Sequence, residues 1–289
     1  MSKVQLENGA IAYTFSSSQY VKNAIDNVEK YLEARNAKLP CRANTPLSPN
    51  YRPELDVTDE LQNVDAAYYQ SLIGILRWMV ELGRIDITCE VSMMSSHLAL
   101  PRVGHLNQLI HMFAYLKKNH NSEIVFDPSD PDIDYELFGR KDWSSSEFSQ
   151  MDGEELPPNA PEARGQGFVM SGYVDADHAT DTMTRKSRTG FIIFLNMAPI
   201  YWCSMKQRQV ESSSFGSEFC AMKHCTEYVR GLRYKLRMMG IAISGPSYLF
   251  GDNQSVLWNA TCPESMLKKK SNSIAYHFVR EGSARDEWR

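Results

Sequence analysis

The sequence lacks the features of disulfide-rich, secreted and membrane-spanning proteins. Its six cysteines include no CxxC pair, which fits reduced thiols better than a disulfide framework or a zinc knuckle. The first residues, MSKVQLENGA, contain no basic start followed by an apolar run, so we expect no secretory or transit peptide. The longest apolar stretch, Gly190 to Cys203, has 14 residues, whereas a membrane-spanning helix needs roughly 20. We therefore expect an intracellular chain, cytoplasmic or nuclear, with no membrane partner.

Internal repeats and glycine-rich phosphate loops are also absent. The 289 residues are 43% hydrophobic, enough for one large or two ordinary domains with buried cores. Charge is unevenly distributed along the chain. Residues from Phe168 onward carry 16 Lys or Arg against 11 Asp or Glu, a net charge of +5, whereas the preceding residues carry 15 against 24, a net charge of −9. The C-terminal part is therefore the better candidate for contact with phosphate.

The segment between these two parts is acidic and rich in proline and serine. Residues 126–167 contain eleven acidic side chains, opposed by Arg140, Lys141 and Arg164. Such a composition buries little apolar surface, so it predicts a loop or linker. We expect a first domain at residues 1–125 and a second at 168–289.

Helical periodicity dominates the first domain. Apolar residues recur at helical spacing in residues 18–36, 66–82 and 103–119, which predicts a smaller, mainly helical domain. After residue 168 the period becomes that of strands, over residues 169–175, 190–195 and 200–204. A long helix from Phe215 to Met239, a strand at 248–251 and two further helices, one across residues 268–281, follow. The second domain is thus predicted to be α/β, with a mixed sheet and the order βββαβα.

Three acidic residues occupy positions suited to a metal site in that topology. Asp175 closes the first strand, Glu218 lies near the start of the long helix, and Asp252 ends the fourth strand. If the first and fourth strands are neighbours, the three carboxylates converge at one end of the sheet. Hard oxygen ligands suit Mg²⁺, with Mn²⁺ as an alternative, and such a cluster supports two-metal phosphodiester hydrolysis. The alternative is that the three acids only cap strand and helix ends.

Other candidate ligands are weaker. Cys220 and His224 are spaced i, i+4 on the long helix, but no second pair accompanies them, so we interpret them as ordinary helix residues. Asp177 lies on the same face of the strand as Asp175 only if the strand continues that far, and we treat it as a supporting position. His178 is the next residue in the sequence and could join the same site.

Basic residues flank the three acids along the sequence. They are expected to hold a phosphate backbone if the metal site exists, although such groups usually form a solvated face. They occur after the first strand, after the third strand and before the last helix: Arg185, Lys186, Arg188, Lys206, Arg208, Lys268, Lys269 and Lys270.

Several motifs resemble the ribonuclease H region of copia-type retrotransposon polyproteins. They are GYVDADH, SSFGSEFCAM, LFGDNQSV and AYHFVRE. Upstream, AAYYQSLIGILRWMVELGRIDITCEVSMMSSHLALP and HMFAYLKKN resemble the stretch that follows the polymerase palm in the same polyproteins. The resemblance extends over nearly the whole chain.

The resemblance implies an RNase H-like fold and cleavage of the RNA strand of RNA–DNA hybrids. Asp175, Glu218 and Asp252 would be the family's first three catalytic acids and would bind magnesium. The first domain would be a remnant of the reverse transcriptase thumb and connection, and the partner would be the remainder of a polyprotein. Two family motifs are absent from the sequence, the YxDD-type polymerase pair and the N-x-A-D-type motif with the fourth acid. We therefore expect no polymerase activity and an impaired, C-terminally truncated nuclease.

Two other functions fit the same residues. The first is a non-catalytic nucleic-acid-binding remnant that has kept the fold, which an assay of metal-dependent hydrolysis on a labelled hybrid would distinguish. The second is a cellular interaction protein that has borrowed the fold, which a comparison of hybrid with duplex DNA in a pull-down would distinguish.

Overall fold

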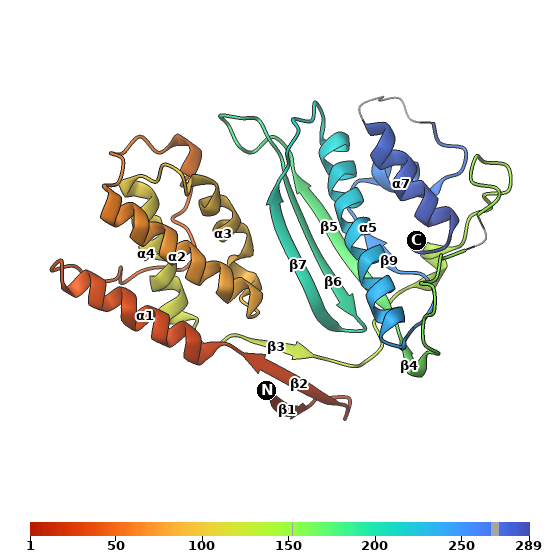
Figure 1. The fold of residues 1–289 in the computed structure, drawn as a ribbon, viewed down its shortest axis with the longest axis horizontal. Helices are drawn as coiled ribbons and strands as arrows, with labels where there is room; N and C mark the ends of the chain where they lie inside the picture. The colour runs from red at the N-terminus through yellow and green to blue at the C-terminus, as the bar shows by residue number, and fades with distance from the viewer. Residues whose placement is uncertain (152, 267–271) are drawn as a thin grey trace. The chain divides into compact units, whose positions relative to one another are not determined.

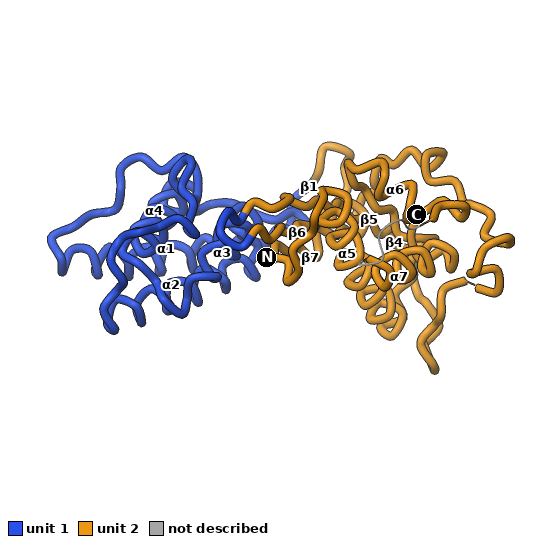
Figure 2. The backbone as a smooth tube through the Cα atoms, turned by 90° about the horizontal axis from the view of Figure 1, so that it is seen from above, with its two compact units in different colours: residues 1–5, 12–126, 181–184 blue, residues 6–11, 127–180, 185–289 orange. Residues whose placement is uncertain are grey.

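The computed structural model describes residues 1–151, 153–266 and 272–289. They form two compact units, shown in different colours in Figure 2. The first unit comprises residues 1–5, 12–126 and 181–184, and the second comprises residues 6–11, 127–180 and 185–289. Among the helices described, none combines the length and the apolar character needed to span a membrane.

The first unit contains four α-helices. They are α1 (Ser18–Glu33), α2 (Asn63–Glu81), α3 (Thr88–Met94) and α4 (Val103–Lys118), with short 3₁₀ helices at Pro53–Leu55, Ile85–Ile87 and Ser95–His97. Helices α1, α2 and α4 match the ranges predicted from periodicity. The apolar stripe of α1 is buried in the core, as its spacing requires: Val21, Ile25, Val28 and Leu32.

A small sheet near the N-terminus was missed by the sequence analysis. Strands β1 (Ser2–Gln5), β2 (Ile11–Ser16) and β3 (Glu123–Phe126) form it in that order, and β2 pairs antiparallel with β3. The three strands have four to six residues each, and β3 follows β2 only after all four helices. Sequence periodicity in so short a run does not reveal a strand whose partner is this distant.

The second unit is built on a four-stranded sheet. Its strands are β5 (Met170–Asp177), β6 (Arg188–Leu195), β7 (Ala198–Lys206) and β9 (Tyr248–Phe250), in the order β7-β6-β5-β9. Strand β5 pairs antiparallel with β6 and parallel with β9, so the sheet is mixed, as predicted. A separate parallel pair, β4 (Arg164–Phe168) with β8 (Ile241–Ile243), was not predicted.

Three helices share a core with one face of this sheet, and the first of them packs directly on its strands (Figure 1). They are α5 (Ser214–Met238), α6 (Gln254–Thr261) and α7 (Ser273–Ala284). Alternate residues of the central strands, such as Val174 and Phe191, are buried against Phe219 of α5 and Val256 of α6 in one core. The helix predicted across residues 268–281 is found as α7 from Ser273 onward, and residues 267–271 lie outside the described part.

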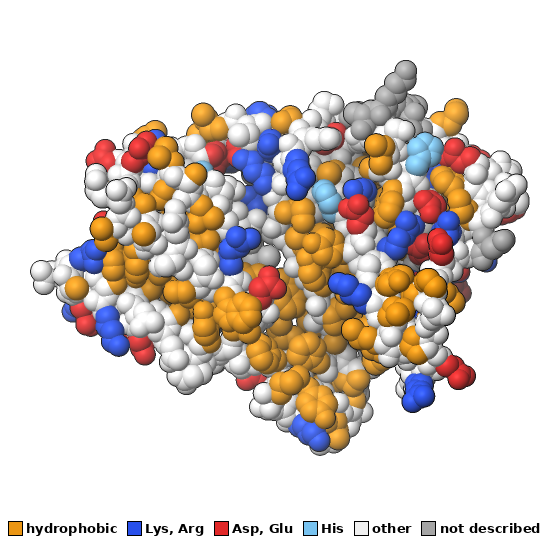
Figure 3. Space-filling model, in the orientation of Figure 1, with side chains coloured by type: hydrophobic (Ala, Val, Ile, Leu, Met, Phe, Trp, Pro, Cys, Tyr) orange, Lys and Arg blue, Asp and Glu red, His pale blue; other side chains and the backbone are white. Residues whose placement is uncertain are grey.

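Ion pairs connect α5 to the C-terminal residues. The Arg230 guanidinium lies 2.6 Å from the Glu287 carboxylate and 3.9 Å from the Glu281 carboxylate. In Figure 3 acidic and basic side chains lie next to one another over α5 and α7. The pair with Glu281 is partly exposed and contributes little by itself, whereas Glu287 is 4% exposed, so its pair with Arg230 is largely shielded from water.

The acidic segment that composition predicts to be a linker belongs to the second unit and is packed in part. Trp143 and Phe148 are buried, with ring centroids 5.8 Å apart, and the Arg280 guanidinium lies 4.8 Å from the centre of the Trp143 ring. Glu154 accepts hydrogen bonds from the Nε and one terminal nitrogen of Arg233, which is 2% exposed. Composition alone underestimated this segment because a few large aromatic rings bury more area than their number suggests.

We predict that Trp143→Ala lowers the free energy of unfolding of the second unit by about 2–4 kcal/mol, because it removes a buried ring and its contact with Arg280. The matched control is Trp258→Ala, since Trp258 is 63% exposed, and its effect should stay within about 0.5 kcal/mol. Urea denaturation followed by circular dichroism measures both. Equal values for the two variants would show that residues 127–167 are not part of the folded unit.

Candidate metal centre

The site begins where β5 extends past its neighbour β9. Strand β5 pairs with β6 along its whole length, from Met170 to Asp177, but its pairing with β9 ends at Tyr173 opposite Phe250. Within the described part of the chain, one edge of β5 therefore has no strand partner from Val174 onward. The free edge lets side chains from other elements approach the backbone of β5 there.

Glu218 reaches this edge from the first turns of α5. The helix starts after Ser213, whose side chain accepts a hydrogen bond from the backbone of Gly216. The buried amide of Gln207 donates hydrogen bonds to the Ser217 carbonyl and to the Thr189 hydroxyl, which ties the helix start to β6. The backbone N–H of Ala176 on β5 then donates a hydrogen bond to Glu218. These contacts hold Glu218 against the free edge.

Asp252 is positioned by the turn between β9 and α6. It follows the last residues of β9, and the next residue, Asn253, is the N-cap of α6, accepting a hydrogen bond from Val256 at 3.2 Å. The backbone therefore changes from strand to helix at Asp252, which directs its carboxylate toward β5.

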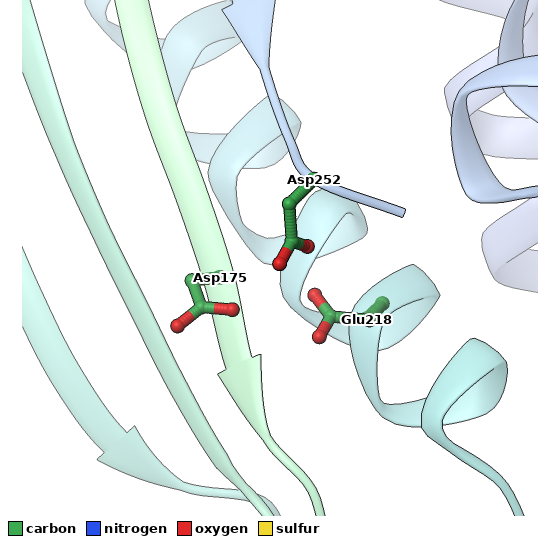
Figure 4. Close-up of side chains that lie close together, drawn as sticks. All are labelled: Asp175, Glu218 and Asp252. Atoms are coloured by element: carbon green, nitrogen blue, oxygen red, sulfur yellow. The ribbon is translucent and has the colours of Figure 1, made fainter. Parts of the chain in front are cut away.

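The three carboxylates meet at this point, as Figure 4 shows. One oxygen from each of Asp175, Glu218 and Asp252 lies within 4.8 Å of the others. Asp175 and Asp252 are exposed, and Glu218 is half-buried. Together with the expected topology, the sequence thus predicted which acids the structure brings together.

The cluster is electrostatically strained. None of its three acids forms an ion pair with another residue in the described part of the chain. Burial, together with the negative charges of Asp175 and Asp252, raises the pKa of Glu218 to about 7, and the hydrogen bond from Ala176 acts in the opposite direction. Bringing the three carboxylates together therefore destabilises the fold unless a cation or a proton offsets their charge.

The three carboxylates fit a divalent cation that prefers hard oxygen ligands. Three carboxylates supply oxygen ligands only, without the imidazole or thiolate that zinc sites usually contain. Two of the three are open to water, as Mg²⁺ prefers because it keeps part of its hydration shell. Asp175, Glu218 and Asp252 would hold such an ion. The identity of the ion remains a prediction.

Basic residues lie next to the acids on the same sheet. In the register of the three antiparallel strands, Asp177 is opposite Arg188, and Arg188 is opposite Lys206. This row lies two residues beyond Asp175, a separation of roughly 7 Å along the strand. Arg185 is in the turn between β5 and β6, with a positive φ of 56°, and Arg208 is exposed after β7. The predicted residues Lys268, Lys269 and Lys270 lie outside the described residues.

The weaker candidate ligands lie on β5, directly after it and on α5. Strand β5 continues to Asp177, which is exposed on the same face as Asp175. The His178 ring nitrogen Nδ1 lies 3.2 Å from the Ser217 hydroxyl, beside Glu218 in sequence. Cys220 Sγ and His224 Nδ1 are 3.8 Å apart, and burial raises the pKa of Cys220 and lowers that of His224. No further metal-binding group joins this pair among the described residues.

Sequence reasoning missed the buried polar residues that position the site. Gln207 is 1% exposed, and Thr189 and Ser217 are fully buried. Single polar residues at the ends of strands and helices usually face solvent, so no pattern in the sequence distinguished these three.

The chain is similar to parts of retrotransposon polyproteins, which confirms the resemblance stated from the sequence. Over 236 residues, 82% of the chain, it is 24% identical to the retrovirus-related Pol polyproteins from transposons RE1 and RE2 of Arabidopsis thaliana. Over 258 residues, 88% of the chain, it is 23% identical to the retrovirus-related Pol polyprotein from transposon TNT 1-94 of Nicotiana tabacum. The matches cover 13%, 14% and 17% of these three relatives. No family model and no solved structure matches the chain.

The raised pKa of Glu218 predicts a pH dependence of stability. The Glu218 carboxyl has a pKa of about 7 in the folded state against an ordinary value of 4.5, so between these values the folded state binds more protons than the unfolded state. The free energy of unfolding of the metal-free protein therefore falls as pH rises through this window, and the loss is complete above it. Glu218→Gln removes the charge and should raise the free energy of unfolding at pH 8 by about 1 kcal/mol, a value discounted for partial exposure.

Thermal unfolding at pH 5 and pH 8, with and without Mg²⁺, measures this effect. We expect Mg²⁺ to raise the melting temperature of the unmodified chain at pH 8 and to leave Glu218→Gln nearly unchanged. The control is Glu227→Gln, because Glu227 lies exposed on the same helix and pairs only with Lys223 among its described ion pairs. A response of Glu227→Gln equal to that of Glu218→Gln would refute the assignment.

Proposed function

We propose that the second unit is an RNase H-like domain that hydrolyses the RNA strand of RNA–DNA hybrids with Mg²⁺. The observation that carries this proposal is the convergence of the Asp175, Glu218 and Asp252 oxygens within 4.8 Å. The resemblance of the motifs around these acids to the ribonuclease H region of retrotransposon polyproteins supports it, as does similarity to Pol polyproteins. We also propose that residues 1–125 derive from the thumb and connection of a reverse transcriptase.

The protein's own groups have separate tasks in this mechanism. Two divalent ions, when bound, supply an activated water and stabilise the oxygen that leaves the phosphate. Asp175 and Asp252 would hold an ion through their exposed oxygens, and Glu218 would hold it through a half-buried oxygen on α5. Glu218 must be deprotonated to bind, so its raised pKa makes ion binding weaken as pH falls below about 7.

Phosphate groups of the substrate would be held beside the acids. The row of Arg188 and Lys206 lies next to Asp175 on the sheet, and the exposed Arg185 and Arg208 extend positive charge beyond it. Such residues contact phosphates without reading bases, so binding depends on charge more than on sequence.

We predict that Asp175→Asn and Asp252→Asn each reduce Mg²⁺-dependent cleavage of a labelled hybrid by about 100-fold or more, because each removes a ligand from the charge-stabilising site. The matched control is Asp177→Asn, on the same strand and face, and we expect it to lose less than about tenfold. Binding of the hybrid in Ca²⁺ and circular dichroism check that each variant is folded. If the unmodified chain binds hybrids but cleaves none with Mg²⁺ or Mn²⁺, the non-catalytic binding function replaces this proposal.

A second prediction concerns the salt dependence of hybrid binding. The logarithm of the association constant should fall linearly with the logarithm of the salt concentration, because phosphate contacts release counterions. Arg208→Gln should reduce the slope by about 1 and weaken binding similarly for different sequences. Lys235→Gln, an exposed substitution on α5, is the control and should change neither. Fluorescence anisotropy at several salt concentrations tests this, and a salt-independent affinity would contradict it.

A further inference from the structure

The sheet face opposite α5 carries an open groove that ends at the acids. The groove has a volume of about 480 Å³ and is lined by Tyr173, Asp175, Gly190, Ile192, Phe250 and Asp252, among others. All of these residues belong to the second unit. The described helices α5, α6 and α7 contribute their buried residues to the core on the other face. The groove therefore adjoins the candidate metal centre directly.

Strand register divides this face into three successive rows. The first row contains Asp177, Arg188 and Lys206 and so is basic on balance, and the second contains Asp175 and Gly190. The third row is apolar, because Tyr173 lies opposite both Phe250 and Ile192. Rows follow one another at roughly 7 Å, since residues two apart share a face. The carboxylates thus lie between a phosphate-binding row and an apolar row.

The apolar row is held rigidly by aromatic contacts. The rings of Tyr173 and Phe250 are stacked, with centroids 4.7 Å apart and an angle of 12° between their planes. Phe194 meets Tyr173 edge-on at 5.8 Å, and Phe138 meets Phe250 edge-on at 5.2 Å. A side chain fixed in this way loses little conformational entropy when a ligand binds against it.

Tyr173 nevertheless remains available to a ligand. Its side chain is 50% exposed, and its hydroxyl forms no hydrogen bond with a described residue. Gly190, beside Asp175, leaves open space in the groove, because a Cβ built there would meet no atom within 4 Å. A flat apolar floor with one free hydroxyl suits the sugar edge of a nucleotide better than its phosphate. The wide, shallow minor groove of an A-form-like duplex presents that edge together with the ribose 2′-hydroxyl.

We propose that Tyr173 binds the ribose of a nucleotide next to the phosphate held at the acids, its ring against the sugar and its hydroxyl bonded to the 2′-hydroxyl. This inference rests on the proposed function, because it takes the acids as the position of the phosphate. Tyr173 then makes the site prefer RNA to DNA in the strand that crosses the groove. Ile192 and Phe250 complete the surface under the sugar.

A substrate scan combined with Tyr173→Phe tests the inference. Hybrids carrying a single 2′-deoxy substitution at successive positions of the RNA strand are titrated in Ca²⁺, which keeps binding separate from cleavage. For the unmodified protein, we expect the dissociation constant to rise about three- to tenfold at one position, the range of one hydrogen bond. Tyr173→Phe should bind the all-RNA strand weaker by the same factor and should show no further loss at that position.

Further variants distinguish the hydroxyl from the ring. Tyr173→Ala should weaken binding more than Tyr173→Phe, because it removes the floor as well. The matched control is Tyr234→Phe, since Tyr234 is 49% exposed on α5, and it should bind every substrate as the unmodified protein does. Calorimetric titration with Mg²⁺ alone should give the same affinity for Tyr173→Phe and the unmodified chain.

The outcomes separate this inference from the proposed function. The inference is wrong, and the proposed function stands, if Tyr173→Phe changes neither hybrid binding nor the 2′-deoxy profile while Asp175→Asn still reduces cleavage. Absence of cleavage with any divalent ion would overturn the proposed function, while a 2′-deoxy effect that depends on Tyr173 would still support ribose recognition. If Tyr173→Ala changes the sedimentation of the chain and not its hybrid affinity, the groove binds a second copy of the chain and the inference is wrong.

Discussion

The organisation of the site depends on the point at which the parallel pairing of β5 and β9 ends. Because pairing stops at Tyr173 and Phe250, β5 continues alone on that side and offers backbone groups to α5. Glu218 and Asp252 then meet Asp175 across a short gap. A β9 strand longer by two residues would pair with this edge and close the gap. The site is thus built where regular sheet hydrogen bonding stops.

The same arrangement lowers the stability of the metal-free fold and at the same time creates a group of cation ligands. Three carboxylates without a described ion pair cost free energy in the metal-free protein, and the rest of the unit offsets that cost by packing. Buried polar residues such as Gln207 hold α5 at a fixed position, so the acids do not move apart to relieve their repulsion. In a rigid, repulsive cluster of this kind a divalent cation competes with protons, because the carboxylates must be deprotonated to bind it.

Much of the fold could be predicted from sequence, because strand alternation and helical spacing are strong in the second unit. The ranges of β5, β6, β7 and α5 follow from these patterns, and the three acids follow from the ends of those elements. The short strands β1 to β4 and β8 could not be predicted, since their partners are distant or their runs are too short for periodicity. The packing of Trp143 was missed because composition averages over a segment and hides a single anchoring ring. Buried Gln207 was missed because burial of one polar side chain depends on tertiary contacts that sequence does not display.

The parallel pairing of β5 with β9 also has a kinetic consequence. Parallel strands need a crossover connection, and here the chain passes through β6, β7 and all of α5 before β9 can pair with β5. Contacts between such distant residues form late, because the entropy of closing the loop is lost before the contacts compensate for it. The hairpins of β5, β6 and β7 are local and can form first. Asp252 therefore joins Asp175 and Glu218 only near the end of folding, so a partly folded chain lacks the third carboxylate of the cluster.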